Sequence, residues 1–396
     1  MICAGTAAEL LCVAGNLRTA AIAESSGAVG EAVNAPRWFA VNEDNDHFFK
    51  CDSSLMDEKG LVDYIDYVCR GKVTHVFFCV SGQRTSYDSR TWEPIWKGLE
   101  EPARQDTATA PDGTRDRWAV NAKKLHDTGI DPYDVWVRRC REKGMRPWVS
   151  MLMNDVHGCN VSNYFRNTSW YKAHPEFRLD PSGKNPDWFM NQLDYARPEV
   201  RAYHLAQVKE IAERWPADGV ELDWMRFGHA FRPGEGRKNA HILDGFMREA
   251  GAAIHAAGRK VAVRVPYKPE KCDELGFNVA KWAKEGLVDV VIPAPFIMSA
   301  RDLPVEGWKA ALAGTKVLLV PDLGCEVDTS DRALVPELYR GIAKSFVDRG
   351  ADGAYIYNLP YKSNAAYSTD SRGKAWCEKL DVAAELYARG MFPEAK

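Results

Sequence analysis

Eight short apolar runs, separated by amphipathic helical patterns, extend along the chain from about Arg37 and limit the folds that it can adopt. Strands that alternate with helices are joined by crossovers, so neighbouring strands run parallel. One helical stretch, "DPYDVWVRRCREKG", has Asp131 as its expected N-cap, Pro132 in its first turn and Gly144 at its end. The expected strands span residues 37–42, 73–80, 146–153, 218–224, 260–266, 288–294, 316–322 and 352–358.

Eight strand–helix units predict an α/β fold of the (β/α)8 (TIM) barrel type. A doubly wound open sheet is the alternative, but such a sheet normally has a glycine-rich turn after its first strand, and "VNEDNDHFF" contains no glycine. Two loops are expected to be long, residues 81–130 after the second strand and residues 154–196 after the third. Because most connections are short, these loops are expected to build the walls of a functional cleft.

We expect residues 36–396 to form a single barrel domain and residues 1–35 to form an N-terminal tail or extension. The N-terminal segment is rich in Ala, Gly and Ser, and Glu9 precedes its weak apolar run "LLCVAG" without an early basic region. That pattern makes a poor secretory signal, so the sequence leaves the cellular location open. The chain has no run of 18 apolar residues, and we therefore expect no membrane span.

The composition argues against several classes of partner. A formal net charge of −3 gives no basic surface of the kind that nucleic acid binding requires. The ten Cys residues form no CxxC pair and no Cys/His cluster, which argues against a structural zinc site. The phosphate-binding motif GxxxxGK[ST] is also missing, so we expect no cofactor and no metal. The sequence does not determine the oligomeric state.

Polar or charged side chains follow seven of the eight expected strands at their carboxyl ends. In a barrel these ends meet at one mouth, where active sites of this fold lie. Polar groups there cost desolvation free energy, so a barrel that only had to be stable would not need them. They are Asn42, Glu43 and Asp44; Gln83 and Arg84; Asn154, Asp155 and His157; Glu221, Asp223 and Arg226; Arg264 and Tyr267; Asp322 and Glu326; and Asn358.

The fourth expected strand, in "DGVELDWMRF", carries two acids on one face. A strand has a side-chain period of two, so Glu221 and Asp223 point to one side while Trp224 points to the other. Because a buried carboxylate needs a partner, Glu221 is either a buried ion-pair partner of Arg264 or a catalytic group. Asp223 is nearer the strand end, and we expect it to be functional.

Paired carboxylates at a barrel mouth favour hydrolysis of a glycosidic bond, in which one carboxyl protonates the leaving oxygen and the other attacks or activates water. The sequence contains no G-x-S-x-G elbow and no HExxH motif. An arginine beside Asp223 would keep it ionised, so Asp223 is the expected nucleophile or base and Glu326 the expected proton donor. These two roles could be exchanged, and Glu221 is the third catalytic candidate.

The remaining polar and aromatic residues at the strand ends are expected to bind a carbohydrate substrate. Several are arginines, which match carboxylate and sulfate groups bidentately, so the substrate could carry an acidic sugar. The expected substrate-binding residues are Asn42, Glu43, Arg84, Asn154, Asp155, His157, Trp224, Arg226, Arg264, Tyr267 and Asn358.

Two other functions are compatible with the same residues. A non-catalytic barrel could use its carboxylates only to accept hydrogen bonds from sugar hydroxyls. A metal-dependent hydrolase or lyase could use Asp44, Asp155, His157 and Asp223 as ligands, although no H-x-H motif follows the first strand.

Several stretches resemble a known group of proteins. "DGVELDWMRF", preceded by "LDYARPEVRAYHLAQVKEIAERW", is similar to the fourth unit of bacterial glycoside-hydrolase-like barrels of the "family 10-like" group. "VTHVFFCVSGQRTSYDS" and "SMLMNDVHGCN" resemble the same group, and the resemblance covers roughly residues 37–365. It implies a (β/α)8 hydrolase that acts on a carbohydrate.

The chain departs from related patterns at its fourth strand. The Asn-Glu pair that many barrel glycosidases carry there is absent, since only Glu221 or Asp223 could match it without the Asn. Glu221-Leu222-Asp223 instead mirrors the Lys-x-Asp pattern of α-galactosidase-like enzymes, which implies that Asp223 is the nucleophile. Those enzymes take their acid from the sixth strand, where this chain has only Asp302, so the resemblance leaves Glu326 and Asp302 as alternative partners.

Overall fold

The computed structural model describes residues 37–44, 47–68, 72–101, 117–160, 163–225, 228–296, 299–324, 335–358 and 391–392. The expected N-terminal tail over residues 1–35 lies outside these ranges, as do the candidate site residues Arg226 and Glu326. The division into a tail and a single barrel domain over residues 36–396 therefore stays a prediction.

The described residues form one eight-stranded sheet in the order β7-β6-β5-β4-β3-β2-β1-β8, and every strand pair in it is parallel. Each strand overlaps one of the eight runs expected from the sequence, which confirms the predicted (β/α)8 barrel. The strands are β1 Trp38–Glu43, β2 His75–Ser81, β3 Arg146–Leu152, β4 Gly219–Asp223, β5 Lys260–Pro266, β6 Val290–Ala294, β7 Leu318–Leu319 and β8 Gly353–Ile356.

The barrel closes between β7 and β8 through backbone hydrogen bonds that extend beyond the short strand β7. The N–H of Asp352 donates to the carbonyl of Leu319 at 2.8 Å, and the N–H of Tyr355 donates to Pro321 at 3.0 Å. The N–H of Leu323 then donates to the carbonyl of Tyr355 at 2.8 Å. These bonds bring the segment after β7 against β8, so the carboxyl ends of both strands share the same mouth.

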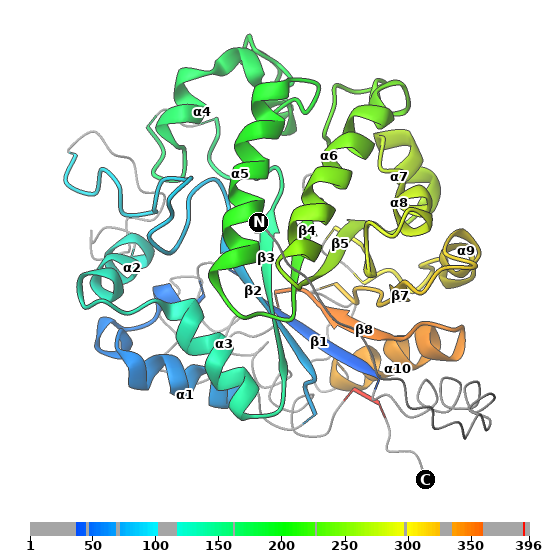
Figure 1. The fold of residues 1–396 in the computed structure, drawn as a ribbon, viewed down its shortest axis with the longest axis horizontal. Helices are drawn as coiled ribbons and strands as arrows, with labels where there is room; N and C mark the ends of the chain where they lie inside the picture. The colour runs from blue at the N-terminus through cyan, green and yellow to red at the C-terminus, as the bar shows by residue number, and fades with distance from the viewer. Residues whose placement is uncertain are drawn as a thin grey trace, which may run out of the picture. The chain divides into compact units, whose positions relative to one another are not determined.

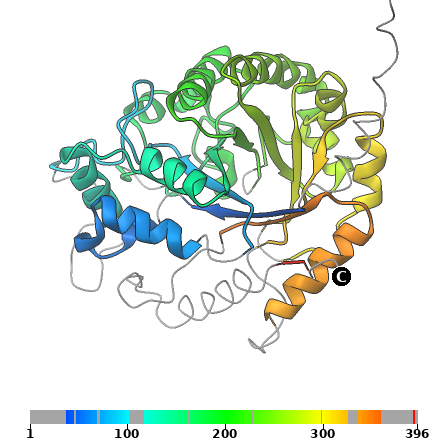
Figure 2. The same ribbon diagram turned by 60° about the horizontal axis from the view of Figure 1, so that its bottom comes forward.

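Helices surround the strands on the outside of the barrel (Figures 1 and 2). The α-helices are α1 Glu58–Val68, α2 Arg117–Asp127, α3 Pro132–Glu142, α4 Ser169–Ala173, α5 Pro198–Arg214, α6 Gly236–Ala256, α7 Pro269–Leu275, α8 Val279–Lys284, α9 Val305–Ala311 and α10 Val335–Asp348. The 3-10 turns are η1 Phe48–Lys50, η2 Ser53–Leu55, η3 Pro175–Phe177 and η4 Trp188–Asn191. Among the described helices, none has both the length and the apolar character to cross a membrane.

Local sequence signals explain where these helices begin. The carboxylate of Asp131 accepts hydrogen bonds from the N–H groups of Tyr133 and Asp134 at 3.0 and 3.3 Å, and Pro132 opens α3, as expected from the sequence. The predicted long loops after the second and third strands are present as well. The first of them contains the helix α2, and the second contains α4, η3 and η4.

The barrel interior is filled at its lower, amino-terminal end by large rings. We call Trp38, Phe77 and Trp148 the lower aromatic layer: the ring centroids of Phe77 and Trp148 are 5.1 Å apart, and those of Trp38 and Trp148 are 5.6 Å apart. Trp148 needs a glycine on the adjacent strand, since a Cβ atom on Gly219 would lie 2.2 Å from its ring. Small and large side chains therefore alternate around the interior, as close packing of a barrel requires.

Candidate active site

The upper interior of the barrel holds an arginine between two carboxylates from different strands. Asp223 ends β4, Arg264 lies in β5, and Asp322 follows β7, and we call these three residues the Arg264 cluster. Arg264 Nη1 lies 3.1 Å from both carboxylate oxygens of Asp223, while its Nε and Nη2 donate to Asp322 Oδ2 at 3.0 and 2.9 Å. All three side chains are at most 1% exposed.

Backbone and aromatic groups complete the surroundings of the cluster. The N–H of Met225 donates to Asp223 Oδ1 at 2.9 Å, and the N–H of Gly324 donates to Asp322 Oδ1 at 2.8 Å. The guanidinium of Arg264 lies 3.9 Å from the centre of the Tyr357 ring. Hydrogen bonds and ion pairs therefore hold both carboxylates in fixed orientations.

Burial has a large effect on the protonation of the two acids. It raises the pKa of Asp223 to about 6, although the charge of Arg264 acts in the opposite direction. Burial also raises the pKa of Asp322, again against the effect of Arg264. The two carboxylates keep the pKa of Arg264 well above its ordinary value, although burial alone would lower it. The charge of Arg264 thus lowers the pKa of both acids, against the effect of their burial.

Glu221 lies on the same face of β4 but has a different partner. The hydroxyl of Tyr355 in β8 donates to its carboxylate oxygens at 3.0 and 3.4 Å. Burial and the neighbouring charge of Asp223 raise the pKa of Glu221 well above its ordinary value. Of the two sequence interpretations of Glu221, a direct ion pair with Arg264 does not form, since Arg264 bonds to Asp223 and Asp322. Glu221 is thus a fully buried acid whose surroundings favour the protonated form.

Uncharged polar groups lie on the inner faces of the strands next to these acids. Asn42 follows Ala40 by two residues in β1 and is 1% exposed, so it shares the inward face of that strand. Neither polar atom of its side chain has a hydrogen-bond partner among the described residues. The hydroxyl oxygens of the buried Ser81 and Ser150 also have none among the same residues. The upper interior therefore has hydrogen-bonding capacity that the described residues do not use.

Two of the expected substrate-binding residues face outward, toward the helices. Glu43 is 1% exposed and lies 3.2 Å from Nδ1 of His47, and burial raises its pKa. Trp224 packs against Tyr195 and Phe277, with ring centroids 5.0 and 5.5 Å apart. Since side chains alternate along a strand, both residues lie on the opposite side of the strand from the Arg264 cluster.

Asp155 and His157 form a pair in the loop that follows β3. The buried Asp155 carboxylate bonds to Nδ1 of His157, whose side chain is 25% exposed. Burial alone would raise the pKa of Asp155, but the charge and hydrogen bond of His157 lower it to about 2. Gln83 donates from Nε2 to the carbonyl of Asp155 at 3.1 Å, which fixes this loop to the one after β2.

Asn154 and Arg84 hold the two long loops in place. The side chain of Asn154 exchanges hydrogen bonds with the backbone of Leu193 at 2.8 and 2.9 Å, and also donates to the carbonyl of His229 at 2.9 Å. Arg84 donates to the carbonyls of Lys97 and Asn167 and forms an ion pair of 3.1 Å with Glu93. Both residues position the loops around the mouth.

Tyr267 and Asn358 lie at the ends of β5 and β8. The carbonyl of Tyr267 accepts a hydrogen bond of 2.7 Å from Trp308, and Lys268 Nζ lies 5.2 Å from the centre of the Tyr267 ring. Asn358 has a left-handed backbone with φ of 59°. No contact in the described structure links either side chain to the Arg264 cluster.

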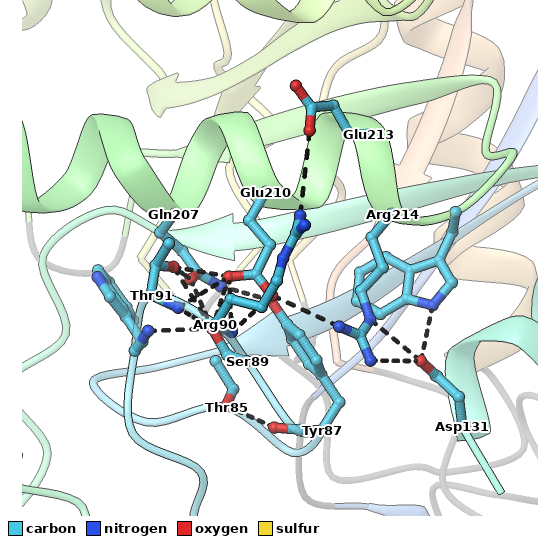
Figure 3. Close-up of polar contacts among 12 residues, drawn as sticks. Thr85, Tyr87, Ser89, Arg90, Thr91, Asp131, Gln207, Glu210, Glu213 and Arg214 are labelled. Atoms are coloured by element: carbon cyan, nitrogen blue, oxygen red, sulfur yellow. Dashed lines mark hydrogen bonds and ion pairs between the residues drawn. The ribbon is translucent and has the colours of Figure 1, made fainter.

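The carboxylate of Glu210 is one of the groups in α5 that fix the loop after β2 (Figure 3). Glu210, which is 2% exposed, accepts hydrogen bonds of 2.8 and 2.7 Å from the hydroxyls of Ser89 and Thr91. The backbone N–H groups of Arg90 and Thr91 donate to the same carboxylate at 3.1 Å. Nothing in the sequence pattern singled out Glu210, because its partners lie about 120 residues away along the chain.

The sequence does not identify the partners that complete the site. It gives Asp322 as a polar residue at a strand end, but it favours Glu326 over Asp322 as a catalytic group. Tyr355 and Tyr357 were not considered, although the period of two in "DGAYIYN" places both on one face of the eighth strand. Among the described residues, no group of three or more His, Cys, Asp or Glu side chains is arranged to hold a metal ion.

Known structures share this barrel. A β-N-acetylhexosaminidase superposes with a TM-score of 0.52 and 13% identity, covering 90% of this chain and 72% of that chain. Alpha-L-fucosidase isoenzyme 2 from Paenibacillus thiaminolyticus gives a TM-score of 0.50 and 12% identity, over 89% of this chain and 50% of that chain. At such identities the likeness shows the fold alone, which is the (β/α)8 barrel of these glycoside hydrolases.

One curated relative matches part of the sequence. The 1,4-alpha-glucan branching enzyme GlgB of Aquifex aeolicus (strain VF5) is 26% identical over 192 residues, which are 48% of this chain and 25% of that protein. The match therefore spans only a quarter of the relative's length. No family model matches the chain. The narrower resemblance to the family 10-like group stays a prediction.

Proposed function

We propose that the protein is a glycoside hydrolase in which Asp223 is the nucleophile or the general base. The Arg264 cluster carries the proposal, because it fixes two carboxylates at the carboxyl end of a barrel, where active sites of this fold lie. The shared fold with a β-N-acetylhexosaminidase and an alpha-L-fucosidase supports it further.

The environment of Asp223 suits a group that must act as an anion. With a pKa of about 6, most of this carboxylate is ionised at neutral pH, and it still accepts a proton readily as the reaction proceeds. Arg264 holds its oxygens in place, while Asp322 shares that guanidinium. Asp223 would attack the anomeric carbon or activate a water, and the positions of both carboxylates relative to the substrate decide between these routes.

The second carboxyl group of the reaction must be a proton donor. Glu326 stays the proposed donor, and it lies outside the described residues. Asp302, the alternative from the resemblance, is exposed in the loop after β6. Glu221 precedes Asp223 by two residues and therefore lies about 7 Å deeper in the barrel, so we assign it a positioning role through Tyr355.

The proposed substrate is an uncharged sugar rather than an acidic one. The guanidinium of Arg264 is held by two carboxylates, and that of Arg84 is held by Glu93 and two backbone carbonyls. Three arginines suggested an acidic sugar from the sequence; these two are already paired within the chain, and Arg226 lies outside the described residues.

The test measures sugar release from a panel of neutral and acidic oligosaccharides by the wild-type protein, Asp223→Asn and Glu326→Gln. We expect Asp223→Asn to lower turnover by a factor on the order of 10⁴. Asp218→Asn is the matched control, since Asp218 precedes the same strand at its opposite end and pairs with Arg141 and Arg146. Equal activity of wild type and Asp223→Asn would refute the assignment.

A non-catalytic carbohydrate-binding barrel is the second candidate. The complete burial of Asp223 and Asp322 suits carboxylates that stabilise the barrel, and a glycan would then bind to other groups at the mouth. Binding of one glycan without turnover, preserved in Asp223→Asn, would identify this function. Loss of activity after exhaustive chelation would instead point to the metal-dependent alternative.

A further inference from the structure

An aromatic ring is exposed at the mouth of the barrel. Phe296 follows β6 by two residues and is 44% exposed. Within the described ranges, the only other large apolar side chain with comparable exposure is Val120 in α2, at 40%. Single exposed apolar residues are common on protein surfaces, so exposure alone assigns no role to Phe296.

Its position links this ring to the candidate active site. The N–H of Asp322 donates to the carbonyl of Pro293 at 2.9 Å, and Pro293 precedes Phe296 by only three residues. Three residues of extended chain span at most about 11 Å. Phe296 and the Arg264 cluster therefore belong to the same mouth, at a separation that one bound oligosaccharide can bridge.

A second ring reaches Phe296 from another part of the barrel. The centroid of Phe189 in η4 lies 6.4 Å from that of Phe296, with the ring planes at 79°. Phe189 belongs to the loop after β3, whereas Phe296 belongs to the loop after β6, and two strands separate β3 from β6 in the sheet. The contact thus joins loops from well-separated parts of the mouth. The rings of Phe189 and Phe296 pack edge to face.

Hydrogen bonds fix the loop that carries Phe189. The backbones of Leu179 and Gln192 are joined by a bond of 2.8 Å, and those of Asp180 and Met190 by one of 2.9 Å. At the tip, the carboxylate of Asp180 accepts from three backbone N–H groups, those of residues 182, 184 and 185. Asp187 caps η4 by accepting from the N–H of Phe189 at 3.0 Å. The ring of Phe189 is therefore presented from an ordered hairpin.

We propose that Phe296, supported by Phe189, is the stacking platform of a sugar-binding subsite for an uncharged sugar ring. The inference rests on the proposed function and deepens it, because it names a binding position next to the carboxylates. The C–H groups on one face of a pyranose are apolar, and an aromatic face removes them from water without competing for the sugar hydroxyls. The exposed ring of Phe296, at the same end of the barrel as the carboxylates, offers such a face.

The experiment compares Phe296→Ala, Phe296→Tyr and Phe189→Ala with Val120→Ala as the matched control. KM and kcat are measured on the neutral oligosaccharide that wild type hydrolyses, and binding of the same glycan is measured by calorimetry in the Asp223→Asn background. We expect Phe296→Ala to raise KM and Kd about 10-fold with little change in kcat, since one aromatic contact is lost. Phe189→Ala should have a smaller effect in the same direction, Phe296→Tyr should retain wild-type affinity, and Val120→Ala should change nothing.

The outcomes distinguish a failure of the subsite from a failure of the proposed function. An unchanged KM and Kd in Phe296→Ala, with wild-type turnover intact, would overturn the subsite and leave the glycosidase assignment standing. A preference of wild type for uronate-containing over neutral oligosaccharides would also overturn the subsite as stated. Absence of any glycan binding or hydrolysis by wild type would overturn both proposals together. Thermal unfolding of each variant shows whether a loss of affinity reflects a loss of fold.

Discussion

The lower half of the barrel interior is filled by aromatic rings, whereas the upper half holds a buried guanidinium between two carboxylates. The same strands supply both halves: β4 has Gly219 beneath Trp148 at one end and Asp223 beside Arg264 at the other. In the lower aromatic layer, burial of apolar surface contributes directly to stability. In the upper half, burial of charges costs desolvation free energy that ion pairs offset only in part.

This difference indicates that stability alone explains the side chains of the lower half but not the buried charges of the upper half. Well-packed apolar groups can replace a buried ion pair without loss of stability, and often with a gain. The chain nevertheless keeps Asp223, Arg264 and Asp322 at the carboxyl ends of three strands, in the half of the barrel where this fold carries out chemistry. The comparison therefore supports the proposed function, and five changes in sequence or pH can test the contrast between the two halves.

The largest effect is expected from Arg264→Met. Removing the guanidinium leaves Asp223 and Asp322 buried without a partner, so the free energy of unfolding should fall by about 3–5 kcal/mol. Urea denaturation at pH 7 measures this change. The triple variant Arg264→Met, Asp223→Asn, Asp322→Asn is the control, and it should recover most of the loss because it has no buried charge. A single variant as stable as wild type would show that the cluster is not buried as described.

The fold could be predicted from the sequence because each strand has its own local signal. Strands that are covered on both sides appear as nearly continuous apolar runs, and turn or cap residues such as Asp131 and Gly144 mark the ends of the helices. The helix α2 was not predicted, since residues 81–130 as a whole have the composition of a loop. The short apolar runs, and the turn and cap residues between them, thus allowed the number and order of the barrel units to be predicted.

The site could be predicted only in part, because alternation along a strand gives the face but not the partner. The period of two places Glu221 and Asp223 together inside the barrel, as the structure shows. Arg264 bonds to Asp322, 58 residues away, and Glu221 bonds to Tyr355, 134 residues away. Such pairs depend on barrel closure and on the stagger between strands, which no local pattern in the sequence reports.

The second largest effect is expected in the lower half, from Gly219→Ala. The added Cβ atom would lie 2.2 Å from the Trp148 ring, which is packed on several sides and cannot move freely. We expect the free energy of unfolding to fall by about 1–3 kcal/mol. Gly245→Ala in α6 is the control: nothing lies within 4 Å of its added Cβ, so it should be neutral or stabilising. Equal effects of both changes would contradict the packing argument.

The third effect is a pH dependence of stability and of kcat/KM, which the Arg264 cluster should show and the lower aromatic layer should not. The pKa of Asp223 is about 6 in the folded protein, above its ordinary 3.8, so protonation of this group stabilises the folded state. That contribution is fully present below about pH 4 and is lost as the pH rises through about 6. If Asp223 must be ionised to act, kcat/KM should rise with pH through about 6.

Asp322→Asn should move this acid limb of kcat/KM to lower pH. The negative charge of Asp322 raises the pKa of Asp223. In the variant that charge is absent, and Asp223 is the one carboxylate of the cluster that still pairs with the guanidinium of Arg264. A pH–rate profile of the variant measures the shift, with Asp218→Asn at the other end of β4 as the control that should not move it. A limb that stays in place or moves to higher pH would show that Asp223 does not set it.

The smallest effect is expected from Glu221→Gln. Burial and the charge of Asp223 raise the pKa of Glu221 and so favour its protonated form. An amide has nearly the shape of that form and still accepts the hydrogen bond from Tyr355. The free energy of unfolding at pH 7 should change by less than about 1 kcal/mol, because no buried hydrogen-bond partner is lost. A loss as large as that in Arg264→Met would mean that Glu221 is ionised and shares the guanidinium. Three carboxylates would then share the guanidinium of Arg264, and its ion pair with Asp223 would no longer distinguish Asp223 as the catalytic anion.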